Sequence, residues 1–124
     1  MILLGWSYNP IGVDIENSNR KIFKDLLIDK YFSYAKEKLA DFKDNNLKLK
    51  ILDYWVINEA VIKLKKGNLF LDGKKWEFNE NISKSFNKHT SEYINSKSFN
   101  VDSWTIGIAN QNISNIYSPI ICKL

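Results

Sequence analysis

The chain has 124 residues, of which 44% are hydrophobic and 14% aromatic, and this composition is sufficient for the core of one domain. The charged fraction of 26% excludes a globally disordered chain, and the net charge of +4 favours acidic partners such as phosphates, an acidic protein or nucleic acid. Arg20 is the only arginine, which disfavours a sequence-specific DNA reader because such proteins usually read bases with arginine.

The sequence also indicates the cellular compartment of the protein. No apolar run is long enough to span a membrane, and the start lacks the basic residues of a signal peptide. Cys122 is the single cysteine, so it cannot form an internal disulfide, and we expect it to be buried in a strand near the end of the chain. These features predict a soluble, cytoplasmic protein with no membrane partner.

The first elements along the chain predict a β-hairpin. An Asn-Pro turn at residues 9–10 separates two apolar runs, so we expect residues 2–16 to form the hairpin. Successive side chains of a strand point to opposite faces of the sheet. Val13 and Ile15 therefore share one face, which we expect to be the core face.

Helices follow the predicted hairpin. Hydrophobic residues recur at helical spacing in the next segment: Ile22, Phe23, Leu26, Leu27 and Tyr31. Residues 33–42 predict a second short helix or a bent extension, and residues 47–65 give the strongest helical pattern. We expect that helix to end at Lys65 and Lys66, where cations complement the helix dipole, with Gly67 as its terminator.

The last part of the chain predicts mainly strands. Asp72-Gly73 suits a type I′ turn, so residues 69–78 are expected to form a hairpin, and residues 82–99 to hold a short strand and a loop. Two more strands are expected at residues 103–109 and 116–124. The order of elements predicts a single α+β domain over residues 1–124, in which a mainly antiparallel sheet packs against one long helix and one or two shorter helices.

Two acids lie in the predicted strand, at Asp14 and Glu16. Alternation places both on the face opposite Val13, with Cβ atoms roughly 7 Å apart. Two carboxylates at this distance repel each other unless a cation or solvent relieves them, and Mg²⁺ takes such oxygen ligands. A magnesium site and an ordinary solvated strand face both fit this pattern.

A third acid, Glu59, lies in the long predicted helix. It falls on the apolar stripe of that helix, which contains Leu52, Trp55 and Ile62. A carboxylate in that position needs a partner, and Lys63 lies four residues further on, within reach. Taken alone, this segment predicts a helix ion pair at the edge of the core.

Taken together, these stretches resemble the 4′-phosphopantetheinyl transferase superfamily. That family has a G-[VI]-D-I-E strand and, some forty residues later, a W-x-x-K-E-A-x-x-K helix that is followed by a glycine-containing turn and leucine. The matching residues are Gly12-Val13-Asp14-Ile15-Glu16, then Trp55, Glu59, Ala60 and Lys63, then Gly67 and Leu69. The segment "KYFSYAKEKLADF" between the two motifs is also similar to its counterpart in the family.

The resemblance implies Mg²⁺-dependent transfer of 4′-phosphopantetheine from coenzyme A to a serine of an acyl or peptidyl carrier protein. The carboxylates that would hold Mg²⁺ against the coenzyme A pyrophosphate are Asp14, Glu16 and Glu59. Glu59 would also accept the serine proton, and Lys63 would act with it by contacting a phosphate. Lys66 and Gly67, in the turn after the helix, would add to the coenzyme A site.

The sequence departs from the family pattern in three places. Asn58 stands where the helix motif has its first lysine, and Lys66 and Asn68 stand where the turn has its two glycines. The long members have two similar halves with a histidine motif between them, whereas Met1 opens the strand here and the only histidine, His89, lies elsewhere. We therefore expect a homo-oligomer, either dimer or trimer, with the Asp14 strand near the interface.

Two other functions stay open from the sequence. One is a catalytically impaired family member that binds coenzyme A or a carrier protein without transfer, as Asn58 suggests. The other is a small basic nucleic-acid-binding domain, which the scattered lysines disfavour.

The start of the first predicted helix is basic; its cations are Arg20, Lys21 and Lys24. This segment would dock an acidic carrier protein, although a solvated helix face explains it equally well.

Overall fold

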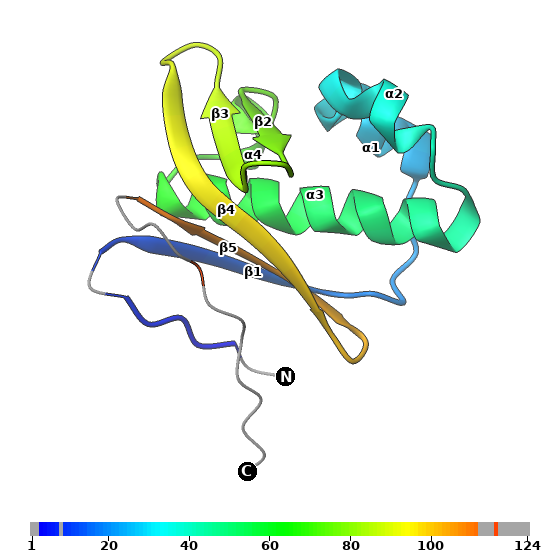
Figure 1. Cartoon of the computed structure of the whole chain (residues 1–124), viewed down its shortest axis with the longest axis horizontal. Coiled ribbons are helices and arrows are strands. Elements are labelled where there is room, and N and C mark those ends of the chain that lie inside the picture. The colour runs from blue at the N-terminus through cyan, green and yellow to red at the C-terminus, as the bar shows by residue number, and fades with distance from the viewer. Residues whose placement is uncertain (1–2, 8, 112–115, 117–124) are drawn as a thin grey trace.

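The computed structural model describes residues 3–7, 9–111 and 116 of the chain. Its helical elements are α1 (Lys24–Tyr31), the 3₁₀ turn η1 (Ser33–Ala35), α2 (Lys36–Leu39), α3 (Asp44–Leu64) and α4 (Leu69–Asp72). Its strands are β1 (Ile11–Asn17), β2 (Trp76–Asn79), β3 (Lys84–Asn87), β4 (Glu92–Val101) and β5 (Trp104–Asn110). The strands form one antiparallel sheet in the order β1-β5-β4-β3-β2, which confirms the predicted α+β fold (Figure 1).

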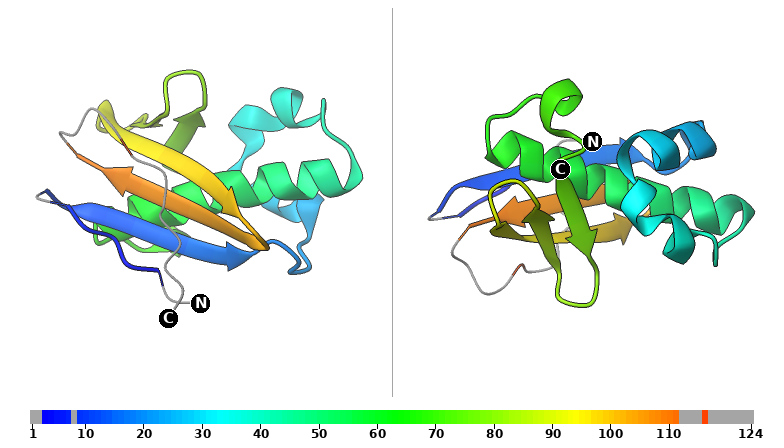
Figure 2. Two further views of the ribbon diagram at one scale, coloured as in Figure 1. Left: turned by 60° about the horizontal axis from the view of Figure 1, so that its bottom comes forward. Right: turned by 90° about the horizontal axis from the view of Figure 1, so that it is seen from above.

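Helix α3 is the centre of the arrangement. It lies across one face of β1, β5 and β4, which run side by side (Figure 2). The short elements α1, η1 and α2 pack on the other side of α3, next to β2. Among the described residues, no helix is long and apolar enough to cross a membrane.

Two glycines allow α3 to lie this close to the sheet. A Cβ atom on Gly12 of β1 would lie 1.9 Å from the carbonyl oxygen of Ala60, and one on Gly107 of β5 would lie 2.2 Å from that of Val56. Neither position can hold a side chain unless the helix moves away. Because Gly12 faces α3, the alternate residues of β1 must face it as well.

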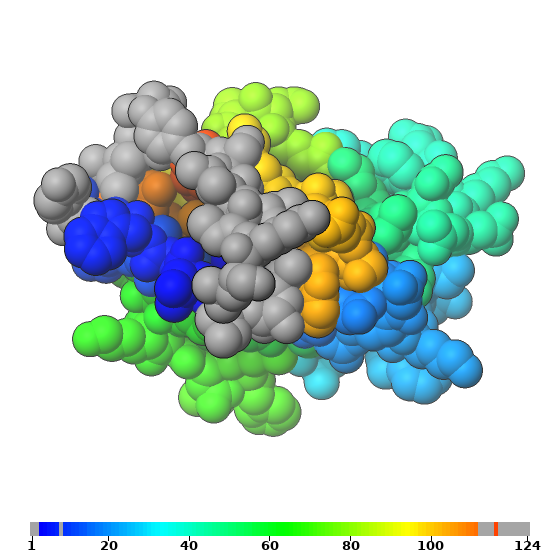
Figure 3. Space-filling model, turned by 90° about the horizontal axis from the view of Figure 1, so that it is seen from below, coloured from blue at the N-terminus to red at the C-terminus, as the bar shows by residue number. Residues whose placement is uncertain are grey.

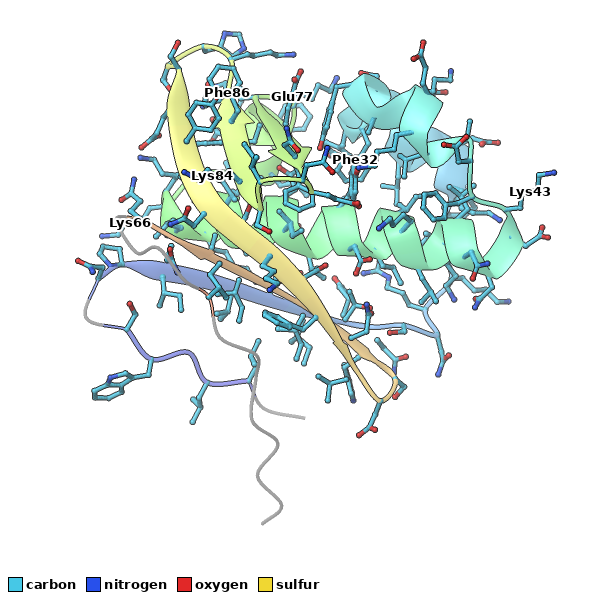
Figure 4. The ribbon with its side chains drawn as sticks, viewed as in Figure 1. Phe32, Lys43, Lys66, Glu77, Lys84 and Phe86 are labelled. Atoms are coloured by element: carbon cyan, nitrogen blue, oxygen red, sulfur yellow. The ribbon has the colours of Figure 1, made fainter. Side chains whose placement is uncertain are left out.

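The core has two parts along α3. Around its N-terminal half, the ring of Tyr54 meets Phe32 edge-on at 5.8 Å and Phe78 at 5.5 Å between centroids. Tyr34 closes this aromatic cluster, because its hydroxyl accepts a hydrogen bond of 2.9 Å from the backbone N–H of Phe78. Around the C-terminal half, the buried residues are aliphatic apart from one tryptophan: Ala60, Val61, Leu64, Trp76, Ile94 and Ala109. Figure 4 shows Phe32 between the short helices and α3.

An ion cluster joins α2, α3 and the turn after β2. Glu80 contacts the ammonium groups of Lys38 at 3.2 Å and Lys50 at 2.8 Å. Burial opposes ionisation of Glu80, but the two lysines outweigh burial and lower its pKa. Each oxygen of the Glu80 carboxylate is therefore paired with one lysine, which is a structural arrangement.

The C-terminal end of α3 has the geometry of a Schellman motif. The backbone N–H of Gly67 donates to the Ile62 carbonyl at 2.9 Å, and that of Lys66 donates to the Lys63 carbonyl at 3.1 Å. Lys66 has the left-handed conformation, with φ of 54°. The helix ends where the sequence predicts, but the left-handed residue is Lys66 and not Gly67.

The hairpin predicted at residues 69–78 is wrong. The side-chain oxygen of Asn68 accepts hydrogen bonds from the backbone N–H groups of Phe70 and Leu71, and the carboxylate of Asp72 accepts one from Asn68. These reciprocal bonds form a helix cap, so the segment folds as α4. Gly73 follows α4 with an ordinary helical φ of −61°, and β2 begins only at Trp76.

The ends of the chain differ from the predicted strands. Residues 3–7 form no strand; Gly5 lies against Val13 on the sheet face away from α3, where Figure 3 shows the blue N-terminal segment. The region 82–99 holds strand β3 and most of β4, where one short strand was predicted. The strand predicted at 103–109 is confirmed as β5, whereas residues 117–124, including Cys122, lie outside the described residues.

Candidate functional site

The two acids of β1 face α3, which reverses the predicted core face. Asp14 is buried, with 8% of its surface exposed, whereas Val13 and Ile15 are only half-buried on the opposite face. The reason is Gly12, which shares the face of Asp14 and fits against the backbone of α3. Alternation is as predicted, but the face that packs on the helix is the one with the carboxylates.

Asp14 is held by one cation from α3. The Lys63 ammonium donates to its Oδ1 atom at 2.6 Å, while Oδ2 is buried and has no hydrogen-bond partner among the described residues. Burial raises the pKa of Asp14; the Lys63 contact opposes that rise without cancelling it, and the charge of Glu16 adds to it. The site therefore holds a buried carboxylate that is only partly compensated.

Glu59 lies one helical turn before Lys63 and is half-buried. Burial raises its pKa, the charge of Asp14 raises it further, and Lys63 only partly offsets the two. The prediction that Lys63 forms an ion pair with Glu59 needs correction, because the Lys63 ammonium contacts Asp14 instead. The spacing along α3 permits the first pairing, but the buried Asp14 carboxylate across the helix–sheet interface needs the cation more.

Glu16, the third acid, is paired with Arg20. The Arg20 Nη1 atom lies 2.7 Å from the Glu16 Oε2 atom, and 23% of the Glu16 side chain is exposed. Three carboxylates, two from β1 and one from α3, are thus electrostatically coupled, and two cations lie among them, Arg20 and Lys63. The sequence did not indicate the contact of Arg20 with Glu16, because a four-residue spacing predicts side-chain contact only within a helix and Glu16 lies in a strand.

The donor atoms suit a hard divalent cation. Within the described ranges, no group of three or more acidic, histidine or cysteine side chains could hold a metal ion as it stands. Mg²⁺, however, is commonly bound by one or two carboxylates together with water and substrate phosphates. The unpartnered Asp14 Oδ2 and the excess of carboxylates over cations fit such a partial set of ligands.

Asn58 serves the opposite side of α3. Its side chain is buried, and its Nδ2 atom donates to the carbonyl oxygen of Gly73 at 3.0 Å, which ties the end of α4 to α3. Its Oδ1 atom has no hydrogen-bond partner in the described part of the chain. This residue is engaged with the α4 turn, whereas its neighbour Glu59 is coupled to Asp14.

Lys66 and Gly67 lie one turn beyond Lys63, at the end of α3 (Figure 4). Gly67 borders a cavity of about 320 Å³, whose polar lining residues include Lys65, Asp72, Lys75, His89 and Glu92. The two lysines of this cavity are each paired with an acid, at 2.9 Å in both cases. His89 is exposed there, on the cavity and not beside the three carboxylates.

A groove that the helical spacing did not predict runs beside Glu16. It has a volume of about 170 Å³ and is lined by Arg20, Lys21, Ile22, Phe23, Leu26, Leu27, Leu52 and Trp55. Phe23 and Leu26, which the spacing placed on an apolar face, are 80% and 60% exposed. Phe23 directly precedes α1, which begins at Lys24, and Leu26 lies in the first turn of that helix.

The comparisons with known proteins agree with this geometry. The sequence model of the 4′-phosphopantetheinyl transferase superfamily matches residues 10–113 of the chain. A search of curated proteins finds no significant match. The matched range spans β1 with its acidic pair, α3 with Glu59 and Lys63, and the whole sheet. The chain belongs to the 4′-phosphopantetheinyl transferase superfamily.

Proposed function

We propose that this protein transfers 4′-phosphopantetheine from coenzyme A to a serine of an acyl or peptidyl carrier protein in a Mg²⁺-dependent reaction. The observation that carries the proposal is the carboxylate cluster between β1 and α3. Its buried Asp14 oxygen has no partner, and its acids outnumber its cations. Asp14, Glu16 and Glu59 are the residues that would hold the metal.

The proposed reaction makes one phosphorus–oxygen bond and breaks another. The carrier's serine oxygen attacks the coenzyme A phosphorus that bears the pantetheine arm, and the bond from that phosphorus to the bridging oxygen breaks, releasing 3′,5′-ADP. Glu59 accepts the serine proton, directly or through water, and burial, which raises its pKa, makes it a stronger base than an exposed glutamate. Bound Mg²⁺ would neutralise charge on the pyrophosphate oxygens.

The cations at the end of α3 would orient coenzyme A. The Lys63 side chain is 52% exposed while its ammonium contacts Asp14, so it can also reach a phosphate in the solvent-facing part of the site. Lys66 and Gly67 follow one turn later and would complete the phosphate contacts. The exposed side chain and the position of Lys63 support this assignment.

The carrier protein would contact the groove beside Glu16. Its rim has Arg20 and Lys21, and exposed apolar side chains of Phe23 and Leu26 lie next to them. A cationic rim around an apolar groove suits an acidic helix with one apolar face. Lys21→Glu should raise KM for the carrier protein and leave KM for coenzyme A unchanged, and equal changes in both would contradict this contact.

We also propose that the protein acts as a homo-oligomer, dimer or trimer, with β1 near the interface. Strand β1 is an edge of the sheet, and alternate residues of β1, β5 and β4 give the face away from α3 an apolar character. The apolar members are Ile11, Val13, Ile15, Phe99, Val101, Trp104, Ile106 and Ile108. Analytical ultracentrifugation should give a mass above that of one chain at micromolar concentration, and a stable monomer would contradict the proposal.

The transfer itself is tested by mass spectrometry. The protein is incubated with coenzyme A, Mg²⁺ and a panel of apo-carrier proteins, and a carrier should gain the mass of one phosphopantetheinyl group. Omitting Mg²⁺ or adding a chelator should stop the gain. Coenzyme A binding by calorimetry without a mass gain on any carrier would instead identify a protein that binds without transfer.

A further inference from the structure

We propose that Arg20 is a removable cation on Glu16: it occupies the metal-facing carboxylate in the magnesium-free protein and must leave when the metal binds. The inference rests on the proposed magnesium site. Its basis is the contact between Arg20 Nη1 and Glu16 Oε2 at 2.7 Å. A divalent cation on the Glu16 carboxylate would repel the guanidinium by charge and compete with it for the negative charge of that carboxylate.

The backbone around Arg20 is fixed, so only its side chain has to move. The Arg20 N–H donates to the Asn17 carbonyl at 3.1 Å, and the Asn19 N–H donates to the Asn17 side-chain oxygen at 2.8 Å. The Ser18 N–H donates to the Ser103 carbonyl at 2.7 Å, which ties the same turn to the start of β5. The turn therefore presents the guanidinium to Glu16 as part of the fold.

The two cations of the site are not equivalent. Lys63 lies on Asp14, whose side chain is 9% exposed, so removing Lys63 would leave a buried charge without a partner. Arg20 is 45% exposed and Glu16 is 23% exposed, so this pair is solvated and weak. Of the two, Arg20 is the cation that a metal can displace at small energetic cost. Arg20 already lines the groove, so its release from Glu16 would leave an unpaired positive charge at the groove rim.

The chain offers a direct way to observe this displacement, because Arg20 is its only arginine. In the ¹⁵N-labelled protein, one arginine Nε–H signal reports on the guanidinium without assignment. Titration with Mg²⁺ in the absence of coenzyme A should shift this signal towards its position in Glu16→Gln and speed its exchange with water. Metal binding that shifts backbone amides of β1 but leaves the arginine signal in place would overturn the proposal.

Affinity provides the second measurement, with Mn²⁺ as a paramagnetic probe followed by electron paramagnetic resonance. Arg20→Gln should bind Mn²⁺ about two- to fivefold more tightly than Lys21→Gln, which loses the same charge from the adjacent residue without breaking the pair. The difference should shrink at high salt. Equal affinities of the two variants, or weaker binding by Arg20→Gln, would overturn the proposal.

The outcomes separate this inference from the function on which it rests. If wild type binds Mn²⁺ better than Asp14→Asn but the arginine signal does not respond, the metal site stands and the role of Arg20 is wrong. If wild type and Asp14→Asn both show no binding, the metal site itself fails, and the role of Arg20 fails with it.

Discussion

Two ion clusters flank α3, and they handle partly buried charge in opposite ways. On the side of α2 and β2, the carboxylate of Glu80 is shared by two lysines, and its pKa is lowered. On the side of β1, three carboxylates share two cations, and the pKa values of Asp14 and Glu59 are raised, in both cases by burial first. The comparison separates a cluster that stabilises the fold from one that stays short of positive charge.

The cluster beside β1 is the place where carboxylates outnumber cations. Local rules of folding are commonly broken at functional sites and obeyed elsewhere. A buried carboxylate oxygen without a partner, as in Asp14, is unfavourable in the free protein and becomes favourable once a cation arrives. The unbalanced cluster is the one that the family motifs also identify.

The largest expected effect is on activity. Asp14→Asn and Glu59→Gln should each lower the rate of transfer by about 10³-fold, because each removes a charge that acts on the reacting phosphate or proton. Glu80→Gln should keep the wild-type rate and lower the free energy of unfolding by about 1 kcal/mol. Rates come from the mass-based assay, and unfolding free energies from urea titration.

For stability, the order of the two clusters is reversed: Glu80→Gln should have the larger effect on the free energy of unfolding, and Asp14→Asn the smaller. Asp14→Asn removes a buried charge that is costly in the free protein, so its free energy of unfolding should not fall as that of Glu80→Gln does. Full activity in Asp14→Asn, or equal loss of activity in Glu80→Gln, would remove the distinction between the two clusters.

Asn58 tests the packing between α3 and α4. Asn58→Leu should lower the free energy of unfolding by about 1–3 kcal/mol, because the Gly73 carbonyl loses its buried donor. Asn45→Leu, at an exposed position of the same helix, is the matched control and should change stability little. A neutral Asn58→Leu would mean that the orphaned Asn58 oxygen offsets what its donor contributes.

The left-handed backbone conformation of Lys66, in the turn after α3, gives a prediction of a smaller effect on stability. Lys66→Gly should raise the free energy of unfolding by about 1 kcal/mol, because it relieves a left-handed conformation that is unfavourable for lysine. If Lys66 contacts phosphate as proposed, the same variant should weaken coenzyme A binding in calorimetry. Lys65→Gly is the control, because Lys65 has φ of −82° and gains nothing from glycine. A destabilised Lys66→Gly would contradict the strain.

The smallest effect is on the pH dependence of stability. The folded pKa of Glu59 is raised, so the folded state binds protons more readily than the unfolded state. This residue therefore adds stability as the pH falls through the folded pKa towards the ordinary value of 4.5, and that stability is lost as the pH rises again. The folded pKa of Glu80 is lowered, so its contribution is present above 4.5 and is lost as the pH falls through the folded pKa. In urea titrations at several pH values, Glu59→Gln should lose the gain in stability at lower pH, and Glu80→Gln should lose the contribution that is present at higher pH. A Glu59→Gln variant that keeps the wild-type profile would contradict the first assignment.

Much of this architecture was predictable from local patterns. The long helix was predicted at 47–65 and observed at Asp44–Leu64, because its hydrophobic period is long and uninterrupted. The hairpin at 69–78 was mispredicted, because the reciprocal Asn68–Asp72 cap competes with the Asp-Gly turn signal and wins. The groove beside Glu16 was missed, since spacing shows which residues share a helix face but not whether that face meets a partner.

Local sequence patterns are enough to establish that Asp14 and Glu16 share a face, that Glu59 and Lys63 lie one turn apart, and that the family motifs are present in order. Which face of β1 is covered depends on the packing of α3 on the sheet. Alternation shows which residues share a face, but the close approach of Gly12 to the α3 backbone decides which face meets the helix. The tertiary structure also decided the ion pairs, with Lys63 on Asp14 and Arg20 on Glu16, since these depend on distances across the helix–sheet interface and the turn after β1. Periodicity is a property of the chain, whereas the compensation of a buried charge depends on whichever elements the fold brings beside it.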